Sequence, residues 1–302
     1  MRFFWLTLIL GIIGIVAACG GDDSSSSSTS GAKVNVVATT VQITALAREV
    51  GGDKIEVKGI IPVGADPHEF EPVASDLQAI EDADVILRHG MELDDWMNDT
   101  LSAGHKDATT VTEGIVPLTA DEDGKTVDDP HVWHDPDNDK IMVDNIAKAL
   151  DAADPADKAA FDANATAYKQ KLDATKTQVQ SIIDEIPADS RKLVTDHDAF
   201  GYFAHAFGMQ IIGAVIPSVS TDAEASAQQT ADLLDTIERE HVKAIFSEQS
   251  ANPKLAQTLA SDANVKIVDT LYGDSLGKPG SGADTVDGML LSNAHQIADA
   301  LK

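Results

Sequence analysis

Histidine and acidic side chains stand at four points of the sequence where they could bind a metal ion. His68 lies in DPHEFEP, His131 and His134 lie in DPHVWHDP, His197 lies in TDHD, and Asp274 lies in YGDS. Imidazole suits zinc and other late transition metals, and a carboxylate adds a harder, charged ligand. Three histidines and one carboxylate could complete a four-coordinate shell, which holds a metal but leaves no open position for catalysis.

The alternative for each histidine is an ordinary structural position. One histidine after a strand is more often a loop or core residue than a ligand, and His89 has this weaker status. His205 is expected to pack within an apolar helix, and the other histidines are expected at the surface: His105, His241 and His295. The His-Glu-x-x-His motif of zinc proteases and the glycine-rich phosphate loop GxxxxGK[ST] are both missing.

Short β-like runs alternate with helical segments, which is typical of a mostly parallel α/β sheet. Strands are expected at 34–38, 55–61, 83–87, 193–195, 210–216, 244–247 and 266–271. Helices are expected at 41–50, 75–83 with Ser75 as N-cap, 200–207, 221–241 and 289–301. Ligands of open α/β sheets bind beyond the carboxyl ends of the strands. His68, His197 and Asp274 follow such strands.

One long helix is expected in the middle of the chain. Residues 154–186 contain no glycine and a single proline, Pro155, which suits the first turn of a helix. A helix of about 30 residues would be about 45 Å long. We therefore expect an N-terminal α/β lobe at 33–153, a linking helix at 154–186 and a C-terminal α/β lobe at 187–302.

The first residues have the order of a secretory signal. Arg2 precedes an apolar run at 3–18, which is short for a membrane span of about 20 residues. The run ends in VAACG, which resembles the bacterial lipobox, where cleavage precedes the cysteine and its thiol carries diacylglycerol. The sequence predicts a signal peptide at 1–18, a lipid anchor on Cys19 and a flexible Ser-rich tether at 19–32. The exported protein would lie on the outer face of the cytoplasmic membrane.

Charge and cysteine content exclude other classes of function. The chain of 302 residues has a net charge of −28, which repels nucleic acid phosphates and attracts cations. The main role expected for so acidic a surface is solubility and not a specific function. The single cysteine excludes an intramolecular disulfide and a cysteine-rich zinc site.

The ordered motifs resemble those of the cluster A-I solute-binding proteins of ABC metal importers, a family of zinc- and manganese-binding lipoproteins. The segments DPHEFEP, DPHVW, VTDHDAF and GDS are similar to its four ligand-bearing segments, with the long helix between the two pairs. The resemblance covers residues 33–302 and implies two α/β lobes joined by a rigid helix. A metal would sit between the lobes, bound by His68, His131, His197 and Asp274.

The same resemblance implies a membrane permease and its cytoplasmic ATPase as partners. We also expect a monomer, and His134 is a candidate for a supporting position behind the ligands. Zinc-type members often carry a His-rich loop before the second motif, whereas residues 119–129 are acidic here. Manganese-type members often have Glu at the third ligand, whereas this chain has His197. Nitrogen in place of oxygen favours Zn²⁺, and Mn²⁺ stays the alternative.

Two other classes of function stay open. A zinc-dependent extracytoplasmic hydrolase would need an open metal position and a general base, for which Glu69, Glu71 or Glu248 could serve. An adhesin would need exposed apolar patches and no converging ligands. The best interpretation is a metal-importer binding protein that is not an enzyme.

Overall fold

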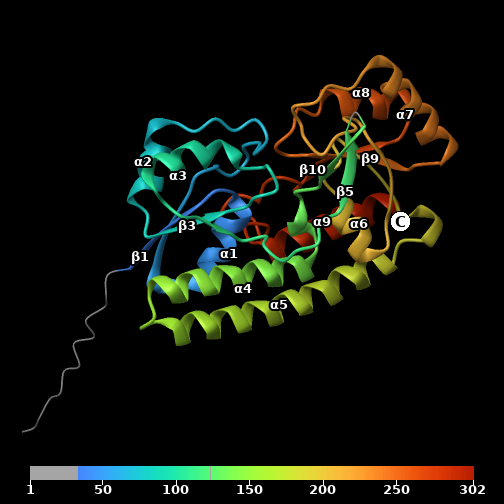
Figure 1. The fold of residues 1–302 in the computed structure, drawn as a ribbon. Coiled ribbons are helices and arrows are strands. Elements are labelled where there is room, and N and C mark those ends of the chain that lie inside the picture. Colours follow the sequence, from blue (N-terminus) through green and yellow to red (C-terminus); the bar gives the residue numbers. More distant parts are fainter. Residues whose placement is uncertain (1–32, 123) are drawn as a thin grey trace, which may run out of the picture. The chain divides into compact units, whose positions relative to one another are not determined.

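Two parallel β-sheets organise the described part of the chain, residues 33–122 and 124–302 of a computed structural model (Figure 1). The expected signal peptide, the lipidated Cys19 and the tether lie outside these residues. Each sheet belongs to one α/β lobe, as the sequence predicts, and each has four strands, of which β4 (Thr109–Thr110) was not expected.

The first lobe contains the sheet β2-β1-β3-β4, in which all pairings are parallel. Its strands are β1 (Val34–Ala38), β2 (Ile55–Gly59), β3 (Val85–Arg88) and β4 (Thr109–Thr110). Its helices are α1 (Val41–Gly51), α2 (Ala74–Asp82) and α3 (Asn98–Gly104). The order places β1 at the centre, where its side chains are almost fully buried.

The second lobe contains the sheet β10-β9-β7-β8, which is also parallel. Its strands are β7 (Lys192–Thr195), β8 (Gln210–Ala214), β9 (Ala244–Glu248) and β10 (Lys266–Leu271). Its helices are α6 (Gly201–Phe207), α7 (Ala227–Arg239), α8 (Lys254–Asp262) and α9 (Val286–Leu301). Because β7 and β9 are neighbours, their carboxyl ends bring Asp196 and Glu248 together.

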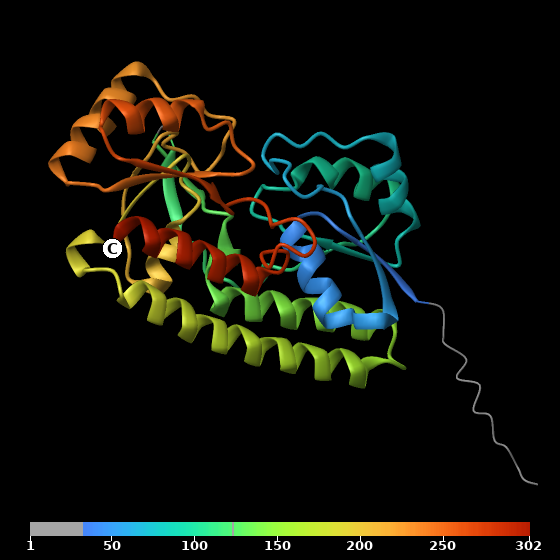
Figure 2. The ribbon, with the colours of Figure 1, turned by 180° about the vertical axis from the view of Figure 1, so that it is seen from behind.

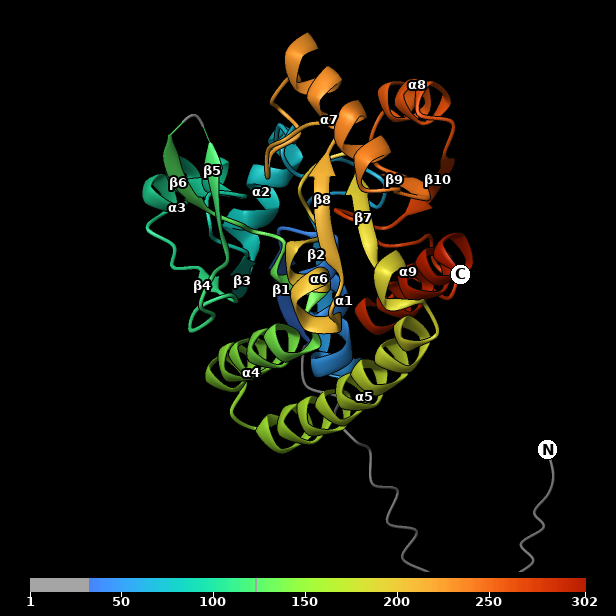
Figure 3. The same cartoon turned by 90° about the vertical axis from the view of Figure 1, so that its right-hand side faces the viewer.

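Two long helices connect the lobes. Helix α4 (Pro136–Ala153) and helix α5 (Lys158–Asp184) lie side by side, and α5 also packs against α1 and α9 (Figures 2 and 3). An antiparallel hairpin of β5 (Thr119–Glu122) and β6 (Lys125–Asp128) precedes α4. None of the helices in the described ranges is long and apolar enough to cross a bilayer.

The main hydrophobic core is shared by both lobes. It joins side chains of β1 and α1 with those of α4, α5, α6 and α9 in one buried cluster. Two smaller clusters lie under α7 and α8 of the second lobe and under α2 and α3 of the first. The shared core fixes the first lobe against the second through the helices that run along both.

Local details differ from the expected helix ends. The helix expected at 154–186 begins at Lys158, because Pro155 lies in a turn that separates it from α4. Ser75 is inside α2, whose N-cap is Val73. The sequence analysis also missed α4, although Asp135 caps it through its side chain and Pro136 begins it.

Asp139 of α4 is buried without compensation. Its side chain has no exposed surface, and neither carboxylate oxygen has a hydrogen-bond partner among the described residues. Burial, together with the charges of Asp135 and Asp287, raises the pKa of Asp139 well above its usual value. Folding therefore favours the protonated carboxyl.

Replacing Asp139 by Asn should raise the free energy of unfolding at pH 7, because Asn has the shape of the protonated acid without its titration. The unfolded carboxyl ionises above about pH 4, so wild-type stability should fall by up to about 1.4 kcal/mol per pH unit above that point. Urea unfolding at pH 4 to 8 measures the difference, which should shrink at low pH. Asp235→Asn, at an exposed position of α7, is the matched control. Equal curves for D139N and wild type would contradict the assignment.

Candidate metal centre

Four side chains from distant parts of the sequence converge at the junction of the two lobes. The donor atoms of His68, His131, His197 and Asp274 all lie within 4.8 Å of one another. The imidazole Nε2 of His131 lies 3.4 Å from Nε2 of His68 and 3.2 Å from Nε2 of His197. The structure thus brings together the four residues that the resemblance implied as ligands.

The first lobe positions its two histidines with the same local device. His68 lies in the loop between β2 and α2, and its backbone N–H donates to Asp66 Oδ1 at 2.9 Å. His131 follows β6, and its N–H donates to Asp129 Oδ1 at 2.9 Å. Both sites are Asp-Pro-His, in which the aspartate binds the backbone two residues later. Asp129 Oδ1 also lies 2.7 Å from Nδ1 of His131, which turns Nε2 toward the cluster.

The second lobe contributes its two donors from strand ends. His197 comes two residues after β7, and Asp274 comes three residues after β10. The Asp274 carbonyl accepts from Gln42 Nε2 of α1 at 3.0 Å, and the neighbouring Gly273 carbonyl accepts from Trp133 Nε1 at 2.9 Å. These two buried hydrogen bonds join the lobes directly behind the cluster.

The separations between donors suit one small cation. Zinc–nitrogen bonds of about 2.0–2.1 Å give a tetrahedron with edges of about 3.3 Å. The carboxylate of Asp274 lies 3.2 Å from Nε2 of His131, 3.3 Å from Nε2 of His197 and 3.7 Å from Nε2 of His68. Asp274 Oδ1 is buried and has no hydrogen-bond partner among the described residues. The donor set therefore fits a tetrahedral metal ion.

Burial and mutual attraction set the pKa values in the cluster. Burial lowers the pKa of His68 to about 3. Burial also opposes protonation of His131, but the charges and hydrogen bonds of Asp274 and Asp129 together outweigh burial and raise this pKa to about 9. For His197 burial is outweighed by Glu248 and Asp274, so its pKa is raised well above the usual value. Asp274 keeps a pKa well below its usual range despite burial, because His197 and His131 attract its charge.

The other histidines lie outside the cluster. His134 is fully buried and stacks on Phe200 with 4.7 Å between ring centroids, and neither of its ring nitrogens has a partner among the described residues. Its supporting role stays a prediction. His89 is buried, with Nε2 2.8 Å from the Pro130 carbonyl oxygen. The expectation for His205 was wrong, because its side chain is exposed on α6.

Two carboxylates behind the ligands were not assigned this role from sequence. Asp129 contacts His131 as described, and the repeated Asp-Pro-His pattern was the available signal. Glu248, considered only as a base for a hydrolase, has Oε1 2.7 Å from Nδ1 of His197. Its position at the end of β9 could have suggested contact with the cluster, but not this orientation.

Residues 273–277 have the letters Gly-x-Ser-x-Gly, although no nucleophile elbow was expected from the sequence. A nucleophile elbow requires a sharp strand-to-helix turn and a histidine beside the serine. Here α9 begins only at Val286. The Ser275 hydroxyl accepts from the backbone N–H of Gly64 at 2.7 Å and contacts the Leu276 carbonyl at 3.3 Å. Ser275 thus joins the two ligand-bearing loops.

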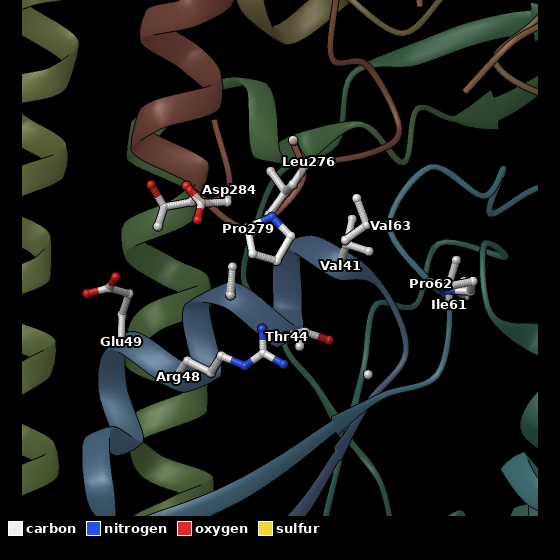
Figure 4. Close-up of a pocket in the computed structure, with 14 residues that line it drawn as sticks. Val41, Thr44, Arg48, Glu49, Ile61, Pro62, Val63, Leu276, Pro279 and Asp284 are labelled. Carbon is white, nitrogen blue, oxygen red and sulfur yellow. The ribbon is translucent and has the colours of Figure 1, made fainter. Parts of the chain in front are cut away.

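A separate hollow of about 370 Å³ lies between α1 and the segment after β10 (Figure 4). Arg48 and Glu49 line it from α1, and Leu276 and Pro279 line it from the other side. It contains none of the four cluster residues. Both groups of His and acidic side chains able to hold a metal, within the described ranges, include His197. No group of this kind lies apart from the cluster in the described ranges.

Comparison with known proteins identifies the family. A family model described as zinc-uptake complex component A, periplasmic, matches residues 36–300. The chain belongs to this zinc-uptake component A family. The match includes both lobes and all four residues of the cluster.

Similar curated proteins are named for manganese or for metal in general. The manganese ABC transporter substrate-binding lipoprotein PsaA of Streptococcus anginosus is 32% identical over 98% of this chain and 97% of its own length. The metal ABC transporter substrate-binding lipoprotein FimA of Streptococcus parasanguinis is 31% identical over 96% and 95%.

Solved structures share the fold. The periplasmic zinc-binding protein TroA from Treponema pallidum superposes with a TM-score of 0.83 at 31% identity, covering 89% of this chain and 99% of TroA. A manganese-bound periplasmic metal-binding protein from Candidatus Liberibacter asiaticus gives 0.79 at 27% identity, covering 89% and 100%.

Gly273 should tolerate no side chain. An added Cβ would lie 2.0 Å from the Glu248 carboxylate, which must then shift. We expect Gly273→Ala to lower the free energy of unfolding of the metal-free protein by about 1–3 kcal/mol, as for other overpacked sites. Gly104→Ala in α3 is the control, because its nearest contact is 3.5 Å away. Equal stability of the two variants in urea would show that the Glu248 approach is loose.

Proposed function

We propose that this chain binds a divalent transition-metal ion outside the cytoplasm and delivers it to an ABC importer. The ligands are His68, His131, His197 and Asp274. The convergence of these four buried donors, two from each lobe, is the observation that supports the proposal. Membership of the zinc-uptake component A family supports the transport role.

Zn²⁺ is the proposed cargo, with Mn²⁺ as the competitor. Three imidazole nitrogens and one carboxylate suit Zn²⁺, and divalent affinity generally rises from Mn²⁺ to Zn²⁺. The other donors lie 3.2 to 3.7 Å from Nε2 of His131 and from the Asp274 carboxylate, which resembles the edges of a zinc tetrahedron. Relatives named for manganese and for zinc make the competition between the two metals the decisive measurement.

A binding protein is favoured over an enzyme. A hydrolytic zinc site uses three protein ligands and keeps a position for water. Here four side chains converge, so a tetrahedral shell would be complete. Glu248, one of the candidate bases, contacts His197 and the backbone of Asp274 instead of facing an open position.

The proposed setting follows from the leader and the relatives. Cleavage before Cys19 and its lipidation would tether a monomer to the outer face of the cytoplasmic membrane. Relatives named as ABC transporter substrate-binding lipoproteins support this location and imply a permease and an ATPase as partners. The tether would keep the metal carrier within reach of the permease.

Loss of any one ligand should weaken Zn²⁺ binding by more than about 100-fold, because changes behind the ligands alone cost 10- to 100-fold. Single alanine variants of His68, His131, His197 and Asp274 should show this in calorimetric titrations. His295→Ala, at an exposed position of α9, should bind like wild type. A wild-type affinity for His197→Ala would overturn the proposed ligand set. Titration of Mn²⁺ against bound Zn²⁺ tests the choice of metal.

Acid should release the metal, because ligation requires neutral imidazoles. The pKa of His131 is about 9 and that of His197 is also raised, so protons compete with metal already at neutral pH. The apparent Zn²⁺ affinity should fall by about tenfold per pH unit for each displaced proton. Competition with a chelator of known affinity at pH 8, 7, 6 and 5 measures this slope. A flat profile would mean that the histidines are not ligands.

A further inference from the structure

Glu248 connects the two donors of the second lobe. It is the last residue of β9, and its side chain is 1% exposed. Its Oε1 lies 2.7 Å from Nδ1 of His197, and its Oε2 accepts from the backbone N–H of Asp274 at 2.8 Å. One carboxylate therefore contacts both residues at once. No other side chain of the described cluster contacts both from the side away from the donor atoms.

The contact with His197 determines which imidazole nitrogen faces the cluster. Glu248 Oε1 and Nδ1 of His197 are in ion-pair contact without hydrogen-bond geometry. An ionised carboxylate at this distance favours a proton on Nδ1, which leaves the lone pair of Nε2 for a metal. Asp129 lies behind His131 in a similar position and forms a hydrogen bond with Nδ1 at 2.7 Å. The two lobes thus use a similar carboxylate–histidine arrangement, built from different elements.

The position of Glu248 is fixed from both ends. Its backbone N–H donates to Asp196 Oδ2 at 2.9 Å, and Asp196 Oδ1 accepts from the His197 N–H at 3.1 Å. At the other end, the carboxylate approaches the chain so closely at Gly273 that a Cβ would be 2.0 Å away. The Ser250 hydroxyl donates to Oε2 at 3.2 Å. Little room remains for another orientation.

We propose that Glu248 is a positioning residue that sets metal affinity by holding the His197 imidazole and the Asp274 backbone in register. This inference rests on the proposed function and deepens it. Oε2 accepts from the backbone N–H of Asp274 and from the Ser250 hydroxyl, and Oε1 faces Nδ1 of His197, so both oxygens are needed as acceptors. Glutamine has one acceptor and one donor and cannot satisfy both, whereas aspartate keeps two acceptors on a shorter stem.

The test compares Glu248→Gln, Glu248→Asp and the control Glu238→Gln, an exposed position on α7. Zn²⁺ affinity is measured at pH 7.5 by competition with a chromogenic chelator. We expect E248Q to bind about 10- to 100-fold more weakly, E248D to recover part of the loss, and E238Q to stay within twofold of wild type. Thermal unfolding of the metal-free proteins is measured in parallel, so that affinities are compared at a temperature at which every variant is folded.

Co²⁺ supplies a readout that a merely structural role would not change. With Co²⁺ bound, E248Q should show weaker or shifted visible bands, because His197 no longer presents Nε2 in the same orientation. Wild-type Zn²⁺ affinity and Co²⁺ spectrum in E248Q would overturn the inference. So would equal losses in E248Q and E248D accompanied by a lowered unfolding temperature.

The variant His197→Ala distinguishes a failure of the positioning role of Glu248 from a failure of the proposed function. If it loses Zn²⁺ binding while E248Q keeps it, the ligand set stands and the positioning role fails. If His197→Ala itself binds Zn²⁺ like wild type, the proposed function fails independently of Glu248.

Discussion

The donor atoms of the three histidines and Asp274 lie close together in a buried space, and the rest of the structure depends on this arrangement. Lone pairs of imidazoles and a carboxylate at 3.2 to 3.7 Å repel one another unless protons or a cation lie between them. Protonation of His131 and His197, whose pKa values are raised, relieves this repulsion in one way, and a bound metal ion relieves it in another. The carboxylates of Asp129 and Glu248 lie behind the ligands and also favour positive charge there. They therefore favour a bound cation at the cluster.

The direction of the strands in the two lobes determines where the donors lie. In both parallel sheets the loops that follow the strands carry donors, and the shared core along α1, α4, α5 and α9 fixes the lobes with those loops facing each other. The buried bonds from Gln42 and Trp133 to the loop of Asp274 add polar contacts at the same junction. The hollow beside α1 borders the loops that lead to His68 and away from Asp274. Movement of one lobe would therefore change its volume.

Much of the architecture was accessible from sequence, because strand alternation and helical spacing are local signals. The strand β10 and the strand β1 were predicted with their observed bounds. The clustering of four donors followed from ordered motifs and a family resemblance. The role of Glu248 could not be predicted, because its contact with His197 depends on β7 and β9 being neighbours. The exposure of His205 likewise depends on which face of α6 meets the core.

The spacing of the donors along the chain has a consequence for folding. His68 and His131 are 63 residues apart, and His131 and His197 are 66 residues apart. In an unfolded chain, several long loops would have to close before one metal ion could contact all four donors. This closure has an entropic cost, which the interactions formed on folding offset. Metal would then stabilise only the completed molecule, by mass action. A chain threaded unfolded across a membrane would arrive without cargo and could gain it only where it folds.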